Sequence, residues 1–514
     1  MILSAVSEIF YIGYDTHKQT RAINSLDQIM FSDSSTPTGN ATSAPLPLGS
    51  SIAVVGAGIT GLSAAYYLQQ QRPDLNITLL ESTDKPGGIL QTIKRDDFLV
   101  ELGPDMFTTR DDEAVELCRE LGMENQLIST NEEHRGAYII CRDKLCKMPL
   151  GWTMMTPTRM GAILKTPLLS WKGKLRVIAE LFIPRKKNGS DESLASFTRR
   201  RLGQEALERI IQPLISGIYT ADPEQLSMQA TLADFLAMER TGKGLIREGI
   251  QQRRKQSSQE TSTGARYGAF VAPKYGMQSI IAALTDQLKP NTLKLRQRVT
   301  QLEFKNGAWQ LTIEQETQGT TTHQFDRLLL TTSSQITGRL LQDTCPKLSK
   351  LIDNIPLAGA AIVTMGYRLC DIEHPLDAFG VVVPHAENRP LIAISMASQK
   401  FTGRAPQDST LFRIFAGGAL QPELLQWDEE QLIESAKKQL RELLGVNGQP
   451  IFTQVVRWDN KMPQYHVGHV ELVDEIELEL SKNPNLEIAG NAYRGVGIPL
   501  CIRNAKSAVK RLIG

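Results

Sequence analysis

The first pattern in the chain that predicts regular structure begins near residue 51. Ile52 to Val55 form a short apolar run, which is typical of a buried parallel strand. Residues 62–71 follow with a helical pattern, and a second apolar run occupies residues 77–80. The order strand, helix, strand predicts a β-α-β unit with two parallel strands.

The turn between the first strand and the helix carries the chemistry of this unit. Residues 56–61 read GAGITG, a GxGxxG sequence. Gly56 allows a tight turn, Gly58 lets the backbone approach a pyrophosphate, and Gly61 lets helix and strand pack closely. The helix N-terminus offers N–H groups and partial positive charge to phosphates. Glu81 ends the second strand, where a carboxylate accepts hydrogen bonds from a ribose hydroxyl, so the unit predicts a dinucleotide site.

Helical and strand patterns alternate along the rest of the chain. Residues 110–260 are largely helical in pattern, although the basic and polar composition of 241–266 predicts a solvated surface loop. Residues 293–299 read as one strand. Residues 300–313 carry an Asn-Gly pair between two apolar runs, which predicts a β-hairpin.

A second strand, glycine turn and helix close the chain. Residues 486–490 form a strand pattern that ends in glycine, residues 491–498 form the turn, and residues 501–513 have a helical pattern. A dinucleotide half-site needs only one such turn. The second turn therefore favours a large cofactor such as FAD over a nicotinamide.

Composition narrows the classes of protein further. The 514 residues suffice for two or three domains with large cores. Lys and Arg total 57 and Asp and Glu total 56, so the net charge gives no argument for nucleic acid. The six cysteines form no CxxC pair and the seven histidines no HExxH sequence, so we predict no metal site. No apolar run approaches the ~18 residues of a membrane span, which favours a cytoplasmic protein.

The first fifty residues differ from the globular pattern. Residues 1–31 show no clear basic region followed by an apolar segment and a cleavage site. Residues 32–50 are polar and contain prolines, as linkers do. We therefore expect a disordered leader over 1–50, with a targeting role as the alternative.

Several separate motifs resemble a known family. The chain resembles the flavin-dependent amine oxidase superfamily in two sequences, ESTDKPGG at residues 81–88 and ELGPD at 101–105. Within that superfamily it resembles the protoporphyrinogen and coproporphyrinogen oxidase family, through PLISGIYTADPEQLS at 213–227 and the closing turn at 490–498. The resemblance extends from about residue 51 to the end of the chain.

The resemblance implies an α/β fold with a Rossmann-like FAD-binding domain, a discontinuous mixed-sheet substrate domain and a helical subdomain. The expected boundaries are 51–125, 262–336 and 453–514 for the FAD-binding domain, 126–261 for the helical subdomain and 337–452 for the substrate domain.

The resemblance also implies the residues that bind FAD and substrate. Two loops match those that pass the pyrophosphate and isoalloxazine of FAD, Val299 matches a residue whose backbone contacts the adenine, and the closing turn matches positions around the ribityl chain and flavin ring. The implied FAD-binding residues are Gly56, Ala57, Gly58, Ile59, Thr60, Gly61, Glu81, Ser82, Gly88, Ile89, Gly103, Pro104, Asp105, Met106, Val299, Asn491, Val496, Gly497 and Ile498. The implied substrate-binding residues are Gly217, Phe379, Gly380, Val382 and Phe415. Their patterns alone would assign the strand residues among the latter to the core.

The activity that the resemblance implies is the six-electron oxidation of a porphyrinogen to a porphyrin in haem biosynthesis, with FAD as cofactor, dioxygen as acceptor and hydrogen peroxide as product. Hydride transfer requires a meso carbon of the substrate to approach flavin N5 closely in a dry pocket. The sequence shows no Ser/His/Asp triad or paired carboxylates, as expected where the cofactor carries the chemistry. We therefore predict positioning residues and no catalytic acid or base.

Asp105 departs from part of the family. Plant and animal relatives have an arginine after the Gly-Pro, linked to a substrate propionate, whereas this chain has Asp105. Another residue or solvent must then meet the propionate. The GPD sequence is shared by bacterial enzymes for coproporphyrinogen III and for protoporphyrinogen IX, so both substrates stay open.

Two other classes of function stay open as well. One is a flavin oxidase or desaturase that acts on an amine or a polyene, and the other is a non-catalytic relative that serves as a binding module. Residues 165–182 mix apolar and basic side chains, which favours an amphipathic helix packed on a core, with peripheral membrane contact as the alternative. A homodimer is compatible with the resemblance.

Overall fold

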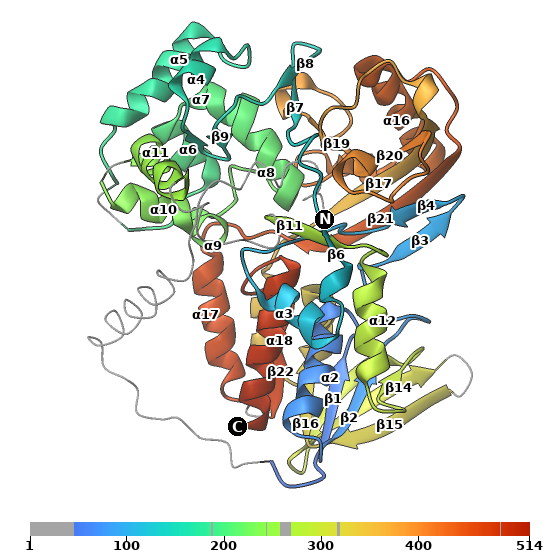
Figure 1. The fold of residues 1–514 in the computed structure, drawn as a ribbon. Helices are drawn as coiled ribbons and strands as arrows, with labels where there is room; N and C mark the ends of the chain where they lie inside the picture. Colours follow the sequence, from blue (N-terminus) through green and yellow to red (C-terminus); the bar gives the residue numbers. More distant parts are fainter. Residues whose placement is uncertain (1–45, 187–188, 243, 258–268, 316–318, 484) are drawn as a thin grey trace.

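The computed structural model describes residues 46–186, 189–242, 244–257, 269–315, 319–483 and 485–514 (Figure 1). The described chain forms two halves. The lower half in Figure 1 contains a parallel sheet with its helices, and the upper half contains a larger sheet beside a group of helices.

A five-stranded parallel sheet is the centre of the lower half, and it confirms the predicted β-α-β unit. Ile52 and Val54 pack in the core on one face of the sheet, whereas Ala53 and Val55 pack in the core on the other. Burial on both faces explains the unbroken apolar runs of the sequence. In spatial order the strands are β12 (Leu293–Lys294), β2 (Asn76–Leu80), β1 (Ser51–Val55), β16 (Arg327–Leu330) and β22 (Leu486–Ile488).

Different layers cover the two faces of this sheet. The helices of one face are α2 (Ile59–Gln71), α3 (Glu113–Glu120), α12 (Gln278–Gln287) and α18 (Ile498–Ile513). The other face carries an antiparallel sheet and three helices, namely β13 (Arg298–Lys305), β14 (Ala308–Gln315), β15 (Gly319–Phe325), α13 (Ser334–Leu341), α14 (Pro346–Asp353) and α17 (His469–Leu480).

The prediction of a single strand over residues 293–299 is wrong, because these residues belong to two strands, β12 and β13. Arg296, between them, has a φ of 56°, and the chain there leaves the parallel sheet for the antiparallel one. The hairpin that follows is confirmed. Asn306 and Gly307 have φ values of 53° and 80°, which is the geometry of a tight Asn-Gly turn between two strands.

The prediction of a surface loop over residues 241–266 is wrong for the part that forms α11 (Gly244–Ser257), and residues 258–266 lie outside the described residues. Leu245 and Ile246 are fully buried. Their backbone N–H groups donate to the buried Glu180 carboxylate at 2.7 and 3.2 Å. A carboxylate distant in sequence thus accepts hydrogen bonds from the first N–H groups of the helix, and its negative charge stabilises the helix N-terminus. The local polar composition does not reveal this partner.

A seven-stranded mixed sheet is the centre of the upper half. Helix α16 (Glu429–Leu444) packs on one of its faces, and the helical group packs on the other. In spatial order the strands are β21 (Phe452–Pro463), β17 (Leu357–Arg368), β20 (Ser409–Gly417), β19 (Ala393–Met396), β18 (Gly380–Val382), β7 (Tyr138–Cys141) and β8 (Lys144–Lys147).

The helical group lies beside this sheet (Figure 1). Its main helices are α4 (Met160–Lys165), α5 (Trp171–Ile178), α6 (Leu194–Arg201), α8 (Gln212–Tyr219), α9 (Met228–Thr231), α10 (Ala233–Arg240) and α11. Smaller strands lie between the two halves, namely the hairpin β3 (Thr92–Arg95) and β4 (Phe98–Glu101) and the sheet of β5 (Phe107–Thr108), β11 (Phe270–Pro273) and β6 (Leu127–Ser129).

Several elements pack across the expected domain boundaries. Strands β7 and β8, expected in the helical subdomain, and β21, expected in the FAD-binding domain, belong to the seven-stranded sheet. Helix α14, expected in the substrate domain, shares a core with α17 in the lower half. The division into domains stays a proposal, and these contacts move its boundaries.

The expected leader falls mostly outside the described residues, which begin at 46. Residues 46–50 belong to the fold. Leu46 is buried in the lower core, its carbonyl accepts a hydrogen bond from Arg72, and the Gly49 carbonyl accepts one from Asn76. The folded chain thus begins before the first strand.

Candidate functional site

The first glycine turn lies at the carboxyl end of β1 and at the N-terminus of α2. Gly56 has a φ of 103°, a conformation that favours glycine. A Cβ atom at Gly61 would lie 1.9 Å from the Gly56 carbonyl oxygen, so the turn admits no side chain there. A Cβ atom at Gly58 would meet no atom of the described residues within 4 Å. Open space therefore lies in front of the helix N-terminus, which is the cradle that a pyrophosphate requires.

The Glu81 carboxylate supports this turn from the end of β2. Its Oε2 accepts a hydrogen bond from the Ala57 N–H at 2.8 Å, and its Oε1 accepts one from the Thr83 N–H at 2.9 Å. Oε1 also accepts a hydrogen bond from the Thr83 hydroxyl at 2.9 Å, whereas Oε2 has the Ala57 N–H as its one described partner and can accept a second bond. Glu81 thus orders the turn and retains the capacity to accept a ribose hydroxyl, a role that stays a prediction.

Two further predicted loops lie against the first turn. Gly58 and Gly87 form an isolated parallel bridge, and a Cβ atom at Gly88 would lie 3.5 Å from the Gly58 Cα. A Cβ atom at Gly103 would lie only 2.0 Å from the Ile89 carbonyl oxygen. The glycines allow three backbone segments that are distant in sequence to meet at one place.

The closing turn brings a second helix N-terminus to the same place. Helix α18 has Gly497 as its N-cap. Thr60, in the first turn of α2, and Cys501, in the first turn of α18, are both buried. Ile59 and Ile498 belong to one core cluster. The structure thus brings together the two glycine turns that lie at opposite ends of the sequence.

The other predicted FAD-binding residues differ in exposure. Val299 is buried on β13, and two residues before it the Gln297 N–H donates to the Glu81 carbonyl oxygen at 2.8 Å. Ser82 is exposed, Asn491 and Val496 are half-buried, and Thr60, Pro104, Asp105 and Met106 are buried.

Three of the predicted substrate residues come together in the upper half. Val382 on β18 lies opposite Ala393 on β19, and Ala393 lies opposite Phe415 on β20, so these side chains share one face of the sheet. Val382 and Phe415 belong to the core cluster that also includes the neighbours of Gly217 on α8. Gly380, on the same face as Val382, and Phe379 are buried as well, although Phe379 lies outside that cluster of the described residues.

A buried group of charges lies beside these residues and was missed by the sequence analysis. Lys400 Nζ lies 2.8 Å and Arg413 Nη1 3.1 Å from the Asp105 Oδ2 atom, and all three side chains are at most 4% exposed. Burial alone would raise the pKa of the Asp105 carboxyl. Lys400 and Arg413 outweigh that effect and hold the pKa below its usual value.

Glu101 and Arg404 complete this group, which we call the buried charge cluster. Glu101 accepts hydrogen bonds from the Met277 N–H at 2.9 Å and from the Thr92 hydroxyl at 2.7 Å, and its burial raises its pKa. Arg404 donates to the Pro273 carbonyl oxygen at 3.0 Å. The cluster therefore contains three cations, Lys400, Arg404 and Arg413, and two carboxyl groups, Glu101 and Asp105.

Arg413 also joins the two halves of the protein. Its guanidinium donates a hydrogen bond to the Gly103 carbonyl oxygen in the GPD loop, and its own strand, β20, lies in the upper sheet. About three hundred residues separate the two partners. The one signal in the sequence is a lone arginine inside an apolar strand pattern, and that signal does not identify its partner.

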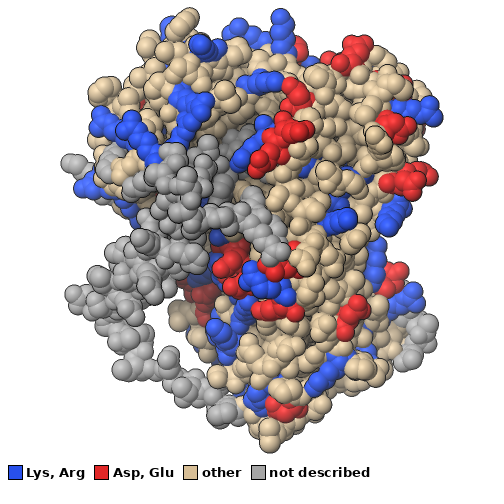
Figure 2. Space-filling model, viewed as in Figure 1, with Lys and Arg blue, Asp and Glu red and all other residues tan. Residues whose placement is uncertain are grey.

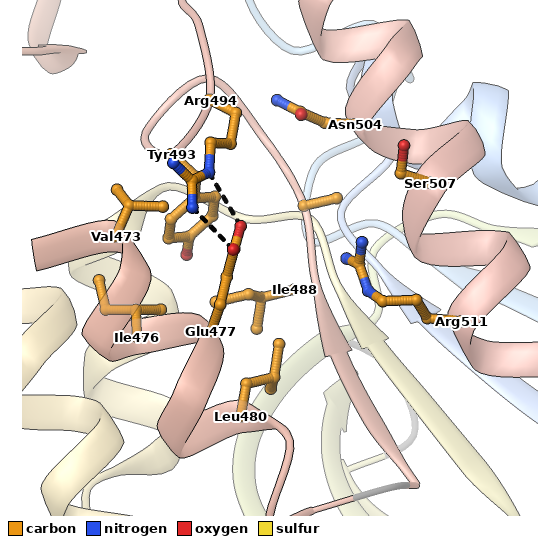
Figure 3. Close-up of a pocket in the computed structure, with 11 residues that line it drawn as sticks. Val473, Ile476, Glu477, Leu480, Ile488, Tyr493, Arg494, Asn504, Ser507 and Arg511 are labelled. Carbon is orange, nitrogen blue, oxygen red and sulfur yellow. Dashed lines mark hydrogen bonds and ion pairs between the residues drawn. The ribbon is translucent and has the colours of Figure 1, made fainter. Parts of the chain in front are cut away.

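A cavity lies elsewhere, between α17, β22 and α18 (Figure 3). Its volume is about 130 Å³, and none of the predicted FAD or substrate residues lines it. On its wall, the Arg494 guanidinium donates to the Glu477 carboxylate at 3.0 and 2.7 Å. Ligand pockets usually exceed about 300 Å³, so we do not assign the substrate to this cavity.

Within the described parts of the chain, no helix has the length and apolar composition needed to cross a membrane. Over the same residues, no three His, Cys, Asp or Glu side chains are placed to hold a metal ion.

The sequence profile of the flavin-containing amine oxidoreductases matches residues 59–513. The chain therefore belongs to this family, and the resemblance inferred from its motifs is confirmed. Within the family it is similar over most of its length to porphyrinogen oxidases. The coproporphyrinogen III oxidase of Bacillus subtilis (strain 168) is 31% identical over 463 residues, which cover 89% of this chain and 97% of the relative.

Relatives of lower sequence identity share the fold, and two of them are also named as porphyrinogen oxidases. The chloroplastic protoporphyrinogen oxidase of Nicotiana tabacum is 27% identical over 484 residues, covering 90% of this chain and 85% of the relative. A solved structure from Exiguobacterium sp. 255-15, assigned to the protoporphyrinogen oxidases, is 29% identical with a TM-score of 0.79, and the match covers 90% of this chain and 98% of that one. Cyclohexylamine oxidase from Brevibacterium oxydans IH-35A, 14% identical with a TM-score of 0.63 over 91% of this chain and 99% of its own, shares the fold. The predicted α/β fold class is thus confirmed.

Proposed function

We propose that this protein oxidises a porphyrinogen to a porphyrin in haem biosynthesis, with FAD as its cofactor and coproporphyrinogen III as its preferred substrate. The observation that carries the proposal is the similarity to three coproporphyrinogen III oxidases, which are 31–32% identical over 89–93% of this chain. The plant relatives named as protoporphyrinogen oxidases are 25–27% identical, and the Exiguobacterium structure assigned to that activity is 29% identical.

FAD fits the residues at the junction of the two turns. The open space at Gly58, in front of the N-terminus of α2, would hold the pyrophosphate of FAD. The N-terminus of α18 would lie toward the flavin end of the cofactor, and Glu81 would accept a ribose hydroxyl. When bound, FAD supplies the acceptor for a hydride from the substrate and passes the electrons to dioxygen, with hydrogen peroxide as the product.

The residues of the chain would orient the substrate and exclude water. Val382, Phe415 and the α8 residues around Gly217 form one buried apolar cluster, which would exclude water from a neighbouring tetrapyrrole. The buried charge cluster has one more cation than carboxyl groups, so its field favours an anionic substrate nearby. Because Lys400 and Arg413 already pair with Asp105, the propionates would bind other groups.

The test is anaerobic reduction of the purified yellow protein, followed as loss of flavin absorbance near ~450 nm. Coproporphyrinogen III, protoporphyrinogen IX and a panel of amines would be mixed separately with it, and porphyrin fluorescence would be recorded after air is admitted. We expect the fastest reduction with coproporphyrinogen III. Reduction by an amine alone would make the protein an amine oxidase, and firmly bound FAD that no compound reduces would contradict an enzymatic role.

Helix α5 packs on the core of the helical group through Val177, as the sequence analysis favoured, and its exposed side supports a peripheral contact with an anionic membrane. Trp171 is 68% and Leu175 64% exposed, one helical turn apart, and basic side chains surround this part of the upper half (Figure 2). Exposed aromatic and aliphatic residues beside basic ones are typical of helices that bind lipid headgroups.

Replacing both Trp171 and Leu175 by serine should therefore abolish co-sedimentation with vesicles that contain an anionic lipid, because the apolar contact is lost. Leu478→Ser is a matched control, since Leu478 is 66% exposed on α17. Equal sedimentation of all three proteins would contradict the membrane contact.

A further inference from the structure

The short segment between β21 and α17 contacts the closing turn, and the proposed function has so far given it no role. The Tyr465 hydroxyl accepts a hydrogen bond from the Gly495 N–H at 2.8 Å and donates one to the Asn491 carbonyl oxygen at 2.7 Å. One phenol group therefore holds both ends of the turn at residues 491–495. This turn leads directly into Val496 and the N-terminus of α18.

His469 holds the middle of the same turn. Its ring stacks on that of Tyr465, with centroids 3.8 Å apart and planes inclined by 13°. Its Nε2 lies 3.0 Å from the Tyr493 carbonyl oxygen, and because a carbonyl only accepts, Nε2 carries the proton. Burial lowers the pKa of His469, which keeps the ring neutral. We call Tyr465 and His469 the ring pair.

The ring pair is held in place from the opposite side. Gln464 donates from Nε2 to the Tyr219 carbonyl oxygen at the end of α8, at 3.2 Å. The Ser227 N–H donates to the Tyr465 carbonyl oxygen at 2.8 Å. Tyr465 and His469 are only 3% and 5% exposed. The hydroxyl is therefore fixed by the fold and does not depend on a bound molecule for its position.

We propose that Tyr465 is a positioning residue of the cofactor site, because its hydroxyl sets the closing turn in the conformation that presents the N-terminus of α18 to FAD. The inference rests on the proposed function in so far as FAD is the bound cofactor. Removing the hydroxyl would leave a half-buried N–H and a half-buried carbonyl without this partner, so the turn would relax toward other conformations.

The test compares Tyr465→Phe with the wild-type protein after FAD has been removed from both. Titration with FAD should give a dissociation constant about ten-fold higher for Y465F, as expected for the loss of two half-buried hydrogen bonds. The visible circular dichroism of the bound flavin should change as well, because it reports the surroundings of the ring. A loss of global stability alone would not alter that signal.

Tyr367→Phe is the matched control. Tyr367 is 1% exposed on β17, and its hydroxyl has only the Met365 sulfur, at 3.8 Å, as a described partner. We expect Y367F to bind FAD with the wild-type dissociation constant and the wild-type flavin spectrum.

Each outcome has a distinct meaning. Y465F with the wild-type dissociation constant and flavin spectrum would overturn the role of Tyr465. Wild-type protein that binds no FAD would instead overturn the proposed function. Should Y465F fail to fold, His469→Phe keeps a stacked ring and removes the bond to Tyr493, so weaker FAD binding supports the proposal and unchanged binding overturns it.

Discussion

Replacing Gly58 by alanine is expected to weaken FAD binding by at least roughly 100-fold while the protein without FAD keeps its wild-type stability. Gly58 has φ −72° and ψ −179°, an extended conformation that alanine adopts readily. The new methyl group would touch no atom of the described chain within 4 Å, but it would fill the space that the pyrophosphate needs in front of α2.

Two measurements on the same samples check this expectation, namely FAD titration and thermal unfolding of the protein without FAD. Gly161→Ala is the control, because a Cβ atom at Gly161 on α4 also meets no described atom within 4 Å. The control should change neither quantity by much. Tight FAD binding by G58A would place the phosphates elsewhere, and a large loss of stability would show that the fold itself requires the glycine.

Replacing Asp105 by asparagine is expected to lower the free energy of unfolding by about 3–5 kcal/mol, because it leaves buried cations without their carboxylate. Lys400 and Arg413 would keep their charges in a site where water does not reach them. Urea unfolding near neutral pH measures the effect. As a control, Asp474→Asn breaks an exposed pair with Arg494 and should cost less than about 1 kcal/mol.

Two further observations separate the loss of charge pairing from a loss of shape. Adding Lys400→Met to D105N should restore part of the stability, because it removes one of the two buried cations that lost the Asp105 carboxylate. In the wild type, the pKa of Asp105 is lowered in the folded state, so its stabilising effect is complete above the ordinary value of 3.8 and is lost as the pH falls through the lowered value. The difference between wild type and D105N should therefore narrow in acid. A constant difference would contradict the ion-pair explanation.

The parts of the site that the sequence predicted depend on local spacing. The GxGxxG turn and Glu81 could be recognised because a strand, a tight turn and a helix within about thirty residues require these residue types. The predicted substrate-binding residues carry no such local signal. Val382 and Phe415 look like ordinary core residues in their own strands, and only the family resemblance singled them out.

The parts that the sequence analysis missed depend on partners far away in the chain. The first N–H groups of helix α11 donate to the carboxylate of Glu180, and the composition around residue 244 gave no sign of that partner. The buried charge cluster joins Asp105 to Lys400 and Arg413 across about three hundred residues. A charged residue in isolation is typical of the surface, so only the fold reveals that these charges are buried and paired.

The strand order of the parallel sheet has a consequence for how the protein is made. Strand β22 and helix α18 come from the last thirty residues, yet β22 completes the sheet and α18 packs against α2. A ribosome synthesises β1 and α2 first. Their apolar surfaces lack β22 and α18 as partners until those elements have been synthesised, more than four hundred residues later. The lower half therefore cannot close before residues 486–513 have been synthesised, and a chain that terminates before them lacks both the sheet edge and the second glycine turn.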